Sequence, residues 1–223
     1  MINIYVSAFL ISSLATDATE RSQPPDPVNL VIVRPFCNHD YHDLLESFNG
    51  WNEFHPCSKG DHNRYTLVLS YSRDLTHSDE IMSKLSHFVD KFKEKSERWH
   101  HCFSSVTLHS ARVPLSLDHY RPDEYYTDPD WVSGPNSQFI EISRWLDYHH
   151  SGALWFLMEG DTRPVKEHWL TTLAHEIESE APFAILGSIY RGDKWDQMLE
   201  KINPALKYHI NGNAVYNLSL IHI

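Results

Sequence analysis

The sequence predicts an α/β domain built on a mostly parallel β-sheet with helices on both faces. Three observations predict this fold class. Short apolar runs rich in β-branched residues alternate along the chain with helical patterns. These runs are continuous, as expected of strands that are covered on both faces. The helical patterns repeat apolar residues at three- and four-residue spacing. Strands that alternate with helices favour parallel pairing through right-handed crossovers.

Five segments have the length and composition of strands. They are residues 28–33, 65–71, 103–113 (centred on 106–108), 153–158 and 183–188. The first, VNLVIV, is typical of a central strand and ends at Arg34-Pro35. A later segment, residues 208–216 (YHINGNAVY), brings a glycine and two asparagines close to the end of the chain.

The clearest helix is predicted for residues 76–101. Thr76 and Asp79 form a capping-box pattern at its start. Its core-facing residues recur at helical spacing: Ile81, Leu85, Phe88, Val89 and Phe92. A short helix is expected at residues 41–48, and another at 195–202. Residues 51–64 and 118–131 are rich in turn-forming or charged residues and are expected to be loops.

Two more helices flank the fourth strand. Gly134-Pro135-Asn136 is typical of a helix start, with Asn136 as the N-cap. Its core face comprises Phe139, Ile142, Trp145 and Leu146. The second helix is expected to begin at Pro164 and to bury residues spaced by four: Val165, Trp169, Leu173 and Ile177.

The length and composition indicate one large domain with a true core. The chain has 223 residues, of which 41% are hydrophobic and 13% aromatic. With 19 basic and 30 acidic residues, its formal net charge is −11. Such a surface disfavours nucleic acid and anionic membranes as partners. It does not exclude a nucleotide, which needs only a local site and can bring a cation with it.

Both ends of the chain carry segments that we expect to lie outside the fold. Residues 1–15 are mostly apolar, and we interpret them as a signal peptide or the remnant of a membrane anchor. The alternatives are a misassigned start or a disordered leader. Residues 16–27 are polar and proline-rich, as in a linker. Residues 1–27 therefore precede a single folded domain at 28–217.

The last six residues, LSLIHI (218–223), match an in-frame translation of CTG TCT CTT ATA CAC ATC. That is the end sequence of a common transposon-based sequencing adapter. We expect residues 218–223 to be a sequencing artefact and the protein to be a fragment cut at its C-terminus. A longer clone that continued through LSLIHI into ordinary coding sequence would contradict this.

The three cysteines, Cys37, Cys57 and Cys102, show no CxxC spacing, so a zinc knuckle is disfavoured. In a secreted chain, Cys37 and Cys57 could form a disulfide and leave Cys102 buried and free. Three free thiols in a reducing compartment is the alternative.

The sequence ALWFLMEGDTRP (residues 153–164) carries the strongest functional signal. It places Glu159-Gly160-Asp161 at the end of the fourth strand. Open α/β sheets bind ligands beyond the carboxyl ends of their strands. Mg²⁺ is typically held by one or two carboxylates together with substrate phosphates. The pattern favours a metal–diphosphate site, although acidic residues are also ordinary N-terminal residues of a helix.

Other common nucleotide and hydrolase motifs are missing. No G-x-G-x-x-G follows the first strand, and the chain has neither a Walker loop nor a G-x-S-x-G elbow. The order of the remaining elements resembles the GT-A type of nucleotide-sugar glycosyltransferase. The resemblance rests on the DxD-like Glu159-Gly160-Asp161, the helix with Trp169 after it, and the later glycine segment His209-Ile-Asn-Gly-Asn213. It spans residues 28–216.

The resemblance implies a Rossmann-like sheet, a nucleoside-diphosphate sugar donor and a glycan or glycoprotein acceptor. It implies Mn²⁺ or Mg²⁺ as cofactor, with Asp161 as the direct metal ligand. Glu159, where the family commonly has Asp, would contact the metal or the ribose. Residues expected to lie near the base, ribose or donor sugar are Arg34, Pro35, Asn136, Gly212 and Asn213. His209 is a weaker candidate for a second metal ligand than for a structural role.

The resemblance also implies a location in the secretory pathway, with the Golgi lumen as the expected compartment. An inverting enzyme of this type needs a carboxylate base, which we expect to lie beyond the C-terminus. Two other functions stay open. One is a sugar-nucleotide nucleotidyltransferase, although RPFCNHD after the first strand lacks the expected glycine. The other is a non-catalytic secreted binding module whose carboxylates only cap a helix.

Overall fold

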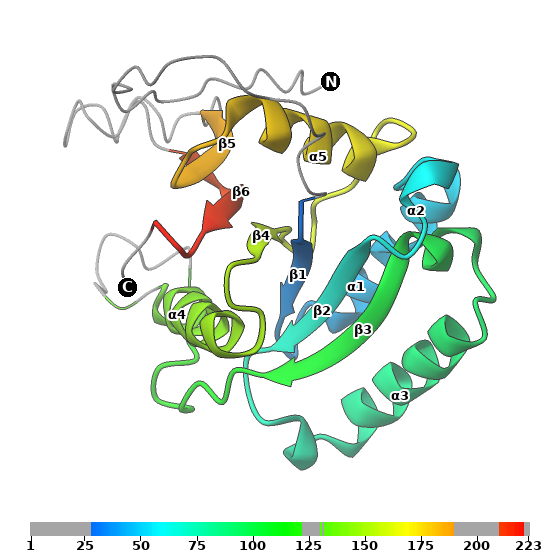
Figure 1. Cartoon of the computed structure of the whole chain (residues 1–223). Helices are drawn as coiled ribbons and strands as arrows, with labels where there is room; N and C mark the ends of the chain where they lie inside the picture. Colours follow the sequence, from blue (N-terminus) through cyan, green and yellow to red (C-terminus); the bar gives the residue numbers. More distant parts are fainter. Residues whose placement is uncertain (1–27, 122–129, 131, 190–209, 221–223) are drawn as a thin grey trace.

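The computed structural model describes residues 28–121, 130, 132–189 and 210–220 (Figure 1). The predicted leader and linker at 1–27, the short helix at 195–202 and His209 lie outside the described residues. The strands are β1 (Leu30–Phe36), β2 (Tyr65–Tyr71), β3 (Phe103–Ser110), β4 (Leu154–Leu157), β5 (Ile185–Ile189) and β6 (Ile210–Asn217). They form one sheet in the order β3-β2-β1-β4-β6-β5.

The sheet is mostly parallel, as predicted. Strand β1 pairs in parallel with β2 and with β4, and β2 pairs in parallel with β3. Strand β6 lies antiparallel between β4 and β5. The α/β fold class with a Rossmann-like, mostly parallel sheet is therefore confirmed. The first strand is central and its apolar residues are buried, which explains its continuous β-branched run.

Helices cover both faces of the sheet. They are α1 (Tyr41–Ser47), α2 (Asn49–Glu53), α3 (Asp79–Lys93), α4 (Ser133–His149) and α5 (Trp169–Glu180). Short 3₁₀ turns add η1 (Lys59–Asp61), η2 (Leu75–His77) and η3 (Arg98–Cys102). Figure 1 shows α4 on one side of the sheet and α3 on the other. No helix in the described parts of the chain is long and apolar enough to span a membrane.

The alternation of side chains along β1 separates two cores. Leu30 and Ile32 pack with residues of α1, α2, α3 and α5 on one face. Val31 and Val33 pack with Ile142 and Leu146 of α4 on the other. Successive side chains of a strand point to opposite faces, so a single strand supplies both cores.

The predicted helix at 76–101 is shorter than expected. Helix α3 ends at Lys93, and Lys95 adopts a left-handed φ of 51°. The ammonium group of Lys95 donates to the carbonyl oxygens of His100 and Phe103. These hydrogen bonds hold the chain in a turn after α3. The capping box is also wrong: Thr76 donates to Asp74 in η2, and Ser78 precedes α3 without a side-chain cap.

Three other local predictions need correction. Helix α4 starts at Ser133 after Val132, so Asn136 lies within its first turn and is not the N-cap. Helix α5 starts at Trp169 and not at Pro164, because His168 has a left-handed φ of 58°. Val165 is consequently 66% exposed, whereas Ile177 is buried as expected. The loop predicted for residues 51–64 contains most of α2 and all of η1.

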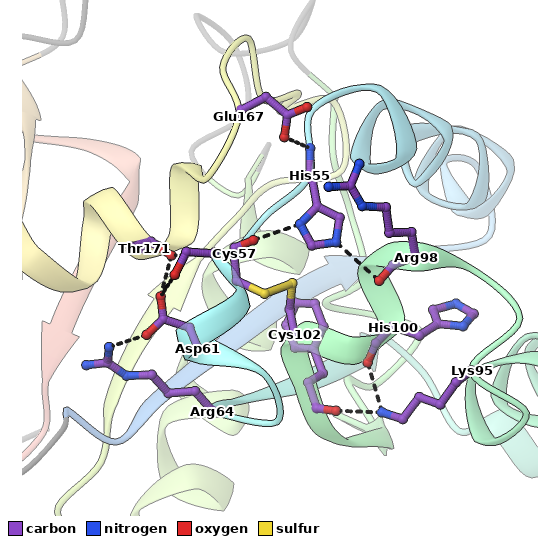
Figure 2. Close-up of a disulfide and its surroundings, with 12 residues drawn as sticks. His55, Cys57, Asp61, Arg64, Lys95, Arg98, His100, Cys102, Glu167 and Thr171 are labelled. Carbon is purple, nitrogen blue, oxygen red and sulfur yellow. Dashed lines mark hydrogen bonds and ion pairs between the residues drawn. A yellow bond between two sulfur atoms is a disulfide. The ribbon is translucent and has the colours of Figure 1, made fainter.

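The disulfide joins Cys57 to Cys102 (Figure 2). Cys37 is a free thiol. The pairing predicted between Cys37 and Cys57 is wrong. Cys57 is bonded to Cys102, which directly precedes β3, whereas Cys37 directly follows β1. Because β1 and β3 run parallel, Cys37 lies at the carboxyl ends of the strands and Cys102 at their amino ends. A seven-residue strand spans roughly 20 Å, which no disulfide can bridge.

Candidate active site

The Glu159-Gly160-Asp161 turn lies where the sheet changes its direction of winding. From β1 to β3 the connections pass through α1, α2 and α3 on one face. The connection from β3 to β4 passes through α4 on the other face. Strands β1 and β4 are neighbours, so a crevice between their carboxyl ends is the expected ligand site of an open α/β sheet. The acidic turn directly follows β4 at this point.

The turn is tied to β6 by hydrogen bonds across more than 50 residues of sequence. The Asn213 side chain donates to Glu159 Oε2 at 2.8 Å and accepts from the Glu159 backbone amide at 2.9 Å. The hydroxyl of Thr162 donates to the same Asn213 oxygen at 2.7 Å. The antiparallel pairing of β4 with β6 places Asn213 just beyond the end of β4. Asn213 thereby fixes both ends of the acidic turn.

Gly212 lies beside the Glu159 side chain of this turn. A Cβ atom at this position would lie 2.6 Å from Glu159 Oε1 and 3.3 Å from its carboxyl carbon. Real Cβ atoms do not show such a contact, so a larger residue here would force the Glu159 carboxylate to move. The structure thus brings together Glu159, Gly212 and Asn213, three residues named from the sequence.

The two carboxylates of the turn differ in environment. Asp161 is exposed to solvent, and Glu159 is half-buried. Burial raises the pKa of Glu159, and the negative charge of Asp161 raises it further, while the hydrogen bond from Asn213 acts in the opposite direction. None of the described residues forms an ion pair with Glu159, and a partly buried carboxylate with a raised pKa is a candidate for a site that binds a cation.

Arg34 lies beneath the turn and is fully buried. Its guanidinium donates to the carbonyl oxygens of Gly160 at 2.9 Å and Thr162 at 3.2 Å, and to the Ser47 hydroxyl at 2.7 Å. Burial lowers its pKa to about 9, and the carboxylates of Asp161 and Asp40 act to raise it, so the group is charged at neutral pH. The Arg34 side chain has no exposed surface, and its hydrogen bonds support the acidic turn from within the protein.

Asp40, at the end of the loop after β1, was missed by the sequence analysis. Its Oδ1 accepts from the Cys37 backbone amide at 2.5 Å, and its Oδ2 lies 3.7 Å from the Cβ position of Gly160. Burial raises the pKa of this carboxyl group. Asp40 and Asp161 both lie close enough to the Arg34 guanidinium to raise its pKa, so two carboxylates interact with this one buried cation. The sequence signal was only an aspartate between a strand and a helix, which is a common arrangement.

The remaining sequence candidates are less closely connected to the turn. Pro35 is partly buried within β1. Asn136 is exposed on the first turn of α4. Helix α4 begins near the carboxyl ends of β1 and β2, because the amide of Gln138 donates to the carbonyl oxygens of Phe36 and Ser70.

The donor atoms at the turn suit a hard divalent cation that is shared with a ligand. Mg²⁺ keeps several waters and takes one or two protein carboxylates plus phosphate oxygens. Glu159 and Asp161 supply such carboxylates. Among the described residues, the one group of three metal-binding side chains within mutual reach is His55, Cys57 and Cys102. Its two cysteines form the disulfide, so this group is not a metal centre.

A cavity of about 720 Å³ lies elsewhere, between α4 and the end of β3 with the segment that follows it. Its walls include His109, Arg112 and Trp145, and none of its lining residues belongs to the acidic turn. Burial lowers the pKa of His109 to about 4, with a smaller contribution from His149. The side chain of His109 is hydrogen-bonded to Ser70 in the sheet, as expected of a structural histidine.

Comparison with known proteins adds little beyond the fold. No family model matches the chain, and no curated protein matches it. Among solved structures, the chain is similar to the apo form of mouse xyloside xylosyltransferase 1, at 13% sequence identity and a TM-score of 0.46. The match covers 86% of this chain and 68% of the mouse chain. A TM-score below 0.5 at this identity is too low to indicate a shared activity.

Proposed function

We propose that the chain is the donor-binding domain of a metal-dependent glycosyltransferase. It would bind a nucleoside-diphosphate sugar through Mn²⁺ or Mg²⁺ and direct the sugar to a hydroxyl group of a glycan or glycoprotein. One observation carries the proposal: the Glu159–Asp161 turn meets the Gly212-Asn213 segment at the β1–β4 switch point, with Gly212 in contact distance of Glu159. A diphosphate site needs carboxylates and close backbone approach at such a place.

Each residue of the acidic turn and of the Gly212-Asn213 segment has its own proposed role. Asp161, the exposed carboxylate, would be the direct cation ligand, and Glu159 would contact the cation or the ribose. Gly212 leaves room beside the turn, and Asn213 holds the Glu159 carboxylate in one orientation through its 2.8 Å hydrogen bond. When bound, the cation supplies Lewis-acid stabilisation of the negative charge that develops on the leaving diphosphate.

The disulfide favours an oxidising compartment. Cys57 and Cys102 are both buried, and their bond lies in the aromatic core around Trp99. Disulfides persist in the secretory pathway and are rare in the cytosol. The disulfide supports our proposal that the protein belongs to the secretory pathway, with the Golgi lumen as the proposed compartment.

The test is isothermal titration of the purified chain with UDP- and GDP-sugars, with and without Mn²⁺. We expect binding of one nucleotide class that depends on Mn²⁺ and that is abolished in Asp161→Ala. The melting temperature of this variant should stay close to that of the wild type, because an exposed carboxylate at a strand end has little packing role.

Two results would contradict the proposal. Absence of binding to every nucleotide sugar tested would favour a non-catalytic binding module. A large fall in melting temperature for Asp161→Ala, without a specific loss of Mn²⁺-dependent binding, would make Asp161 a structural residue. Matched folding of wild type and variant is checked by near-ultraviolet circular dichroism.

A further inference from the structure

Arg34 is a fully buried charge in the central strand. It shares the face of β1 that carries Leu30 and Ile32, in the larger of the two cores. Its guanidinium carbon lies 5.7 Å from the ring centroid of Phe48 and 5.9 Å from that of Trp51. Burying a charge costs free energy unless the charge is paired and hydrogen-bonded. A charged side chain buried in this position therefore needs interactions that compensate for the free-energy cost of its burial.

The hydrogen bonds of Arg34 point to the acidic turn. One terminal nitrogen donates to the carbonyl oxygen of Gly160, directly before Asp161, and the other donates to that of Thr162, directly after it. The planar guanidinium holds its donors in a fixed geometry, so it fixes the distance between these two carbonyl groups. The backbone on both sides of Asp161 is therefore held by one side chain.

The guanidinium of Arg34 is itself hydrogen-bonded to a residue of α1. It donates to the Ser47 hydroxyl at 2.7 Å, and this hydroxyl donates to the carbonyl oxygen of Leu44 at 2.6 Å. Ser47 and Leu44 are both buried in α1. A continuous chain of hydrogen bonds thus runs from α1 through Arg34 to the two peptide groups that flank Asp161.

We propose that Arg34 is the positioning residue of the acidic turn: it sets the affinity for the divalent cation by holding the backbone around Asp161, without contacting cation or nucleotide. This inference rests on the proposed function, because it concerns the same cation site. It gives Arg34, which the resemblance places near the base, a role toward the cation.

Positioning and simple electrostatics predict opposite results. The positive guanidinium lies close enough to Asp161 to interact with its charge. If charge alone mattered, removal of Arg34 would relieve competition for Asp161 and tighten cation binding. If Arg34 positions the turn, its removal loosens the carboxylates and weakens cation binding. The direction of the change therefore separates the two roles.

The experiment measures Mn²⁺ binding by electron paramagnetic resonance, with UDP present as the nucleotide probe. Loss of a partner that orients a metal ligand typically weakens metal affinity about 10- to 100-fold. We expect Arg34→Met to weaken Mn²⁺ binding toward the upper end of that range. We expect about a tenfold loss for Arg34→Lys, because lysine keeps the charge but cannot bridge two carbonyl groups. If Arg34→Met does not fold, Arg34→Lys decides the test.

Arg64 offers a matched control at the other edge of the sheet. Its guanidinium donates to the carboxylates of Asp61 and Glu178 at 2.7 Å each. The Nε atoms of Arg34 and Arg64 are both buried without a partner among the described residues. Arg64→Met should lower the melting temperature and leave the Kd for Mn²⁺ unchanged.

Unchanged or tighter Mn²⁺ binding in folded Arg34 variants would overturn the positioning role and leave the proposed function standing. A loss in Arg64→Met equal to that in Arg34→Met would also overturn it, since any destabilisation would then suffice. A wild-type chain that binds neither Mn²⁺ nor UDP would instead overturn the proposed function itself.

Discussion

Two polar clusters lie at opposite ends of the parallel strands, and they shift the pKa of their carboxyl groups in opposite directions. At the amino edge, near the disulfide, Asp61 accepts hydrogen bonds from Ser58, Arg64 and Thr171 (Figure 2). Burial acts to raise the pKa of Asp61, but the hydrogen bonds from Thr171, Arg64 and Ser58 lower it overall. At the carboxyl edge, burial and Asp161 raise the pKa of Glu159, and the hydrogen bond from Asn213 only partly compensates.

The difference separates a cluster that stabilises the fold from one that is suited to binding. Around Asp61, one guanidinium and two hydroxyls satisfy the charge, and the cluster joins the Cys57 loop to α5 through Thr171 and Glu178. Glu159, by contrast, lies close to the negative charge of Asp161, and no ion pair joins it to a basic side chain in the described parts of the chain. Folded proteins keep such uncompensated charge mainly where a ligand completes it. Substitutions in the two clusters should therefore have opposite effects on stability and on ligand binding.

The largest expected effect on stability comes from the disulfide. Replacement of Cys57 and Cys102 by alanine should lower the free energy of unfolding by about 2–5 kcal/mol, because the bond closes a long loop in the unfolded chain. The affinity for Mn²⁺ should not change, since the disulfide lies at the opposite edge of the sheet. Urea denaturation and Mn²⁺ titration measure the two quantities.

Cys37→Ala serves as the control for this pair, because Cys37 is a free thiol. It should cost less than about 1 kcal/mol. Peptide mapping without reductant should identify the Cys57–Cys102 link. Detection of a Cys37–Cys57 link would contradict the structure.

The largest expected effect on binding comes from Gly212. In Gly212→Ala the new methyl group would collide with Glu159 Oε1, so the carboxylate must move. We expect the Mn²⁺-dependent affinity for nucleotide to fall about 10- to 100-fold, as for other changes that displace a metal ligand. Calorimetric titration measures the loss.

Gly50→Ala is the matched control. No atom lies within 4 Å of a Cβ at Gly50, which is in the short helix α2. Alanine should be neutral or stabilise by up to about 1 kcal/mol there, with unchanged nucleotide binding. Equal nucleotide affinity in Gly212→Ala and wild type would show that the contact with Glu159 has no role in binding.

The smallest effects are expected from a pair of isosteric changes, measured without metal. Glu159→Gln should raise the melting temperature slightly, because it removes a charge that folding disfavours. Asp61→Asn should lower it by an amount that corresponds to about 1–3 kcal/mol, the usual cost when a buried donor loses its partner. Glu159→Gln should weaken Mn²⁺ binding, and Asp61→Asn should not.

The pH dependence of the two variants follows from the signs of the pKa shifts. The folded-state pKa of Asp61 is lowered, so its contribution to stability is present above the unfolded pKa and disappears as the pH falls through the folded value. The folded-state pKa of Glu159 is raised, so its protonation stabilises the fold as the pH falls through that value. Both differences from wild type should therefore shrink in acid, and thermal unfolding over a pH series tests this.

Much of the fold could be predicted from local pattern. The continuous apolar runs located β1, β2 and β4, and the spacing of Ile81, Leu85 and Phe92 located the buried face of α3. The acidic turn could be placed as well, because Glu159-Gly160-Asp161 ends an apolar run. Helix boundaries were less predictable, since the left-handed Lys95 and His168 depend on contacts with distant backbone.

The sequence by itself determined which residue types end each strand, and so it indicated a cation site after β4. Only the tertiary structure decided which partners those residues meet. The parallel order of β1 and β3 separated Cys37 from Cys102, and the antiparallel β6 brought Gly212 and Asn213 to the acidic turn. Arg34 lies on the face of β1 from which its guanidinium reaches the carbonyl groups on both sides of Asp161. The periodicity of apolar residues reflects neighbours in the sequence. These contacts depend instead on strand order and register, which the local sequence pattern does not specify.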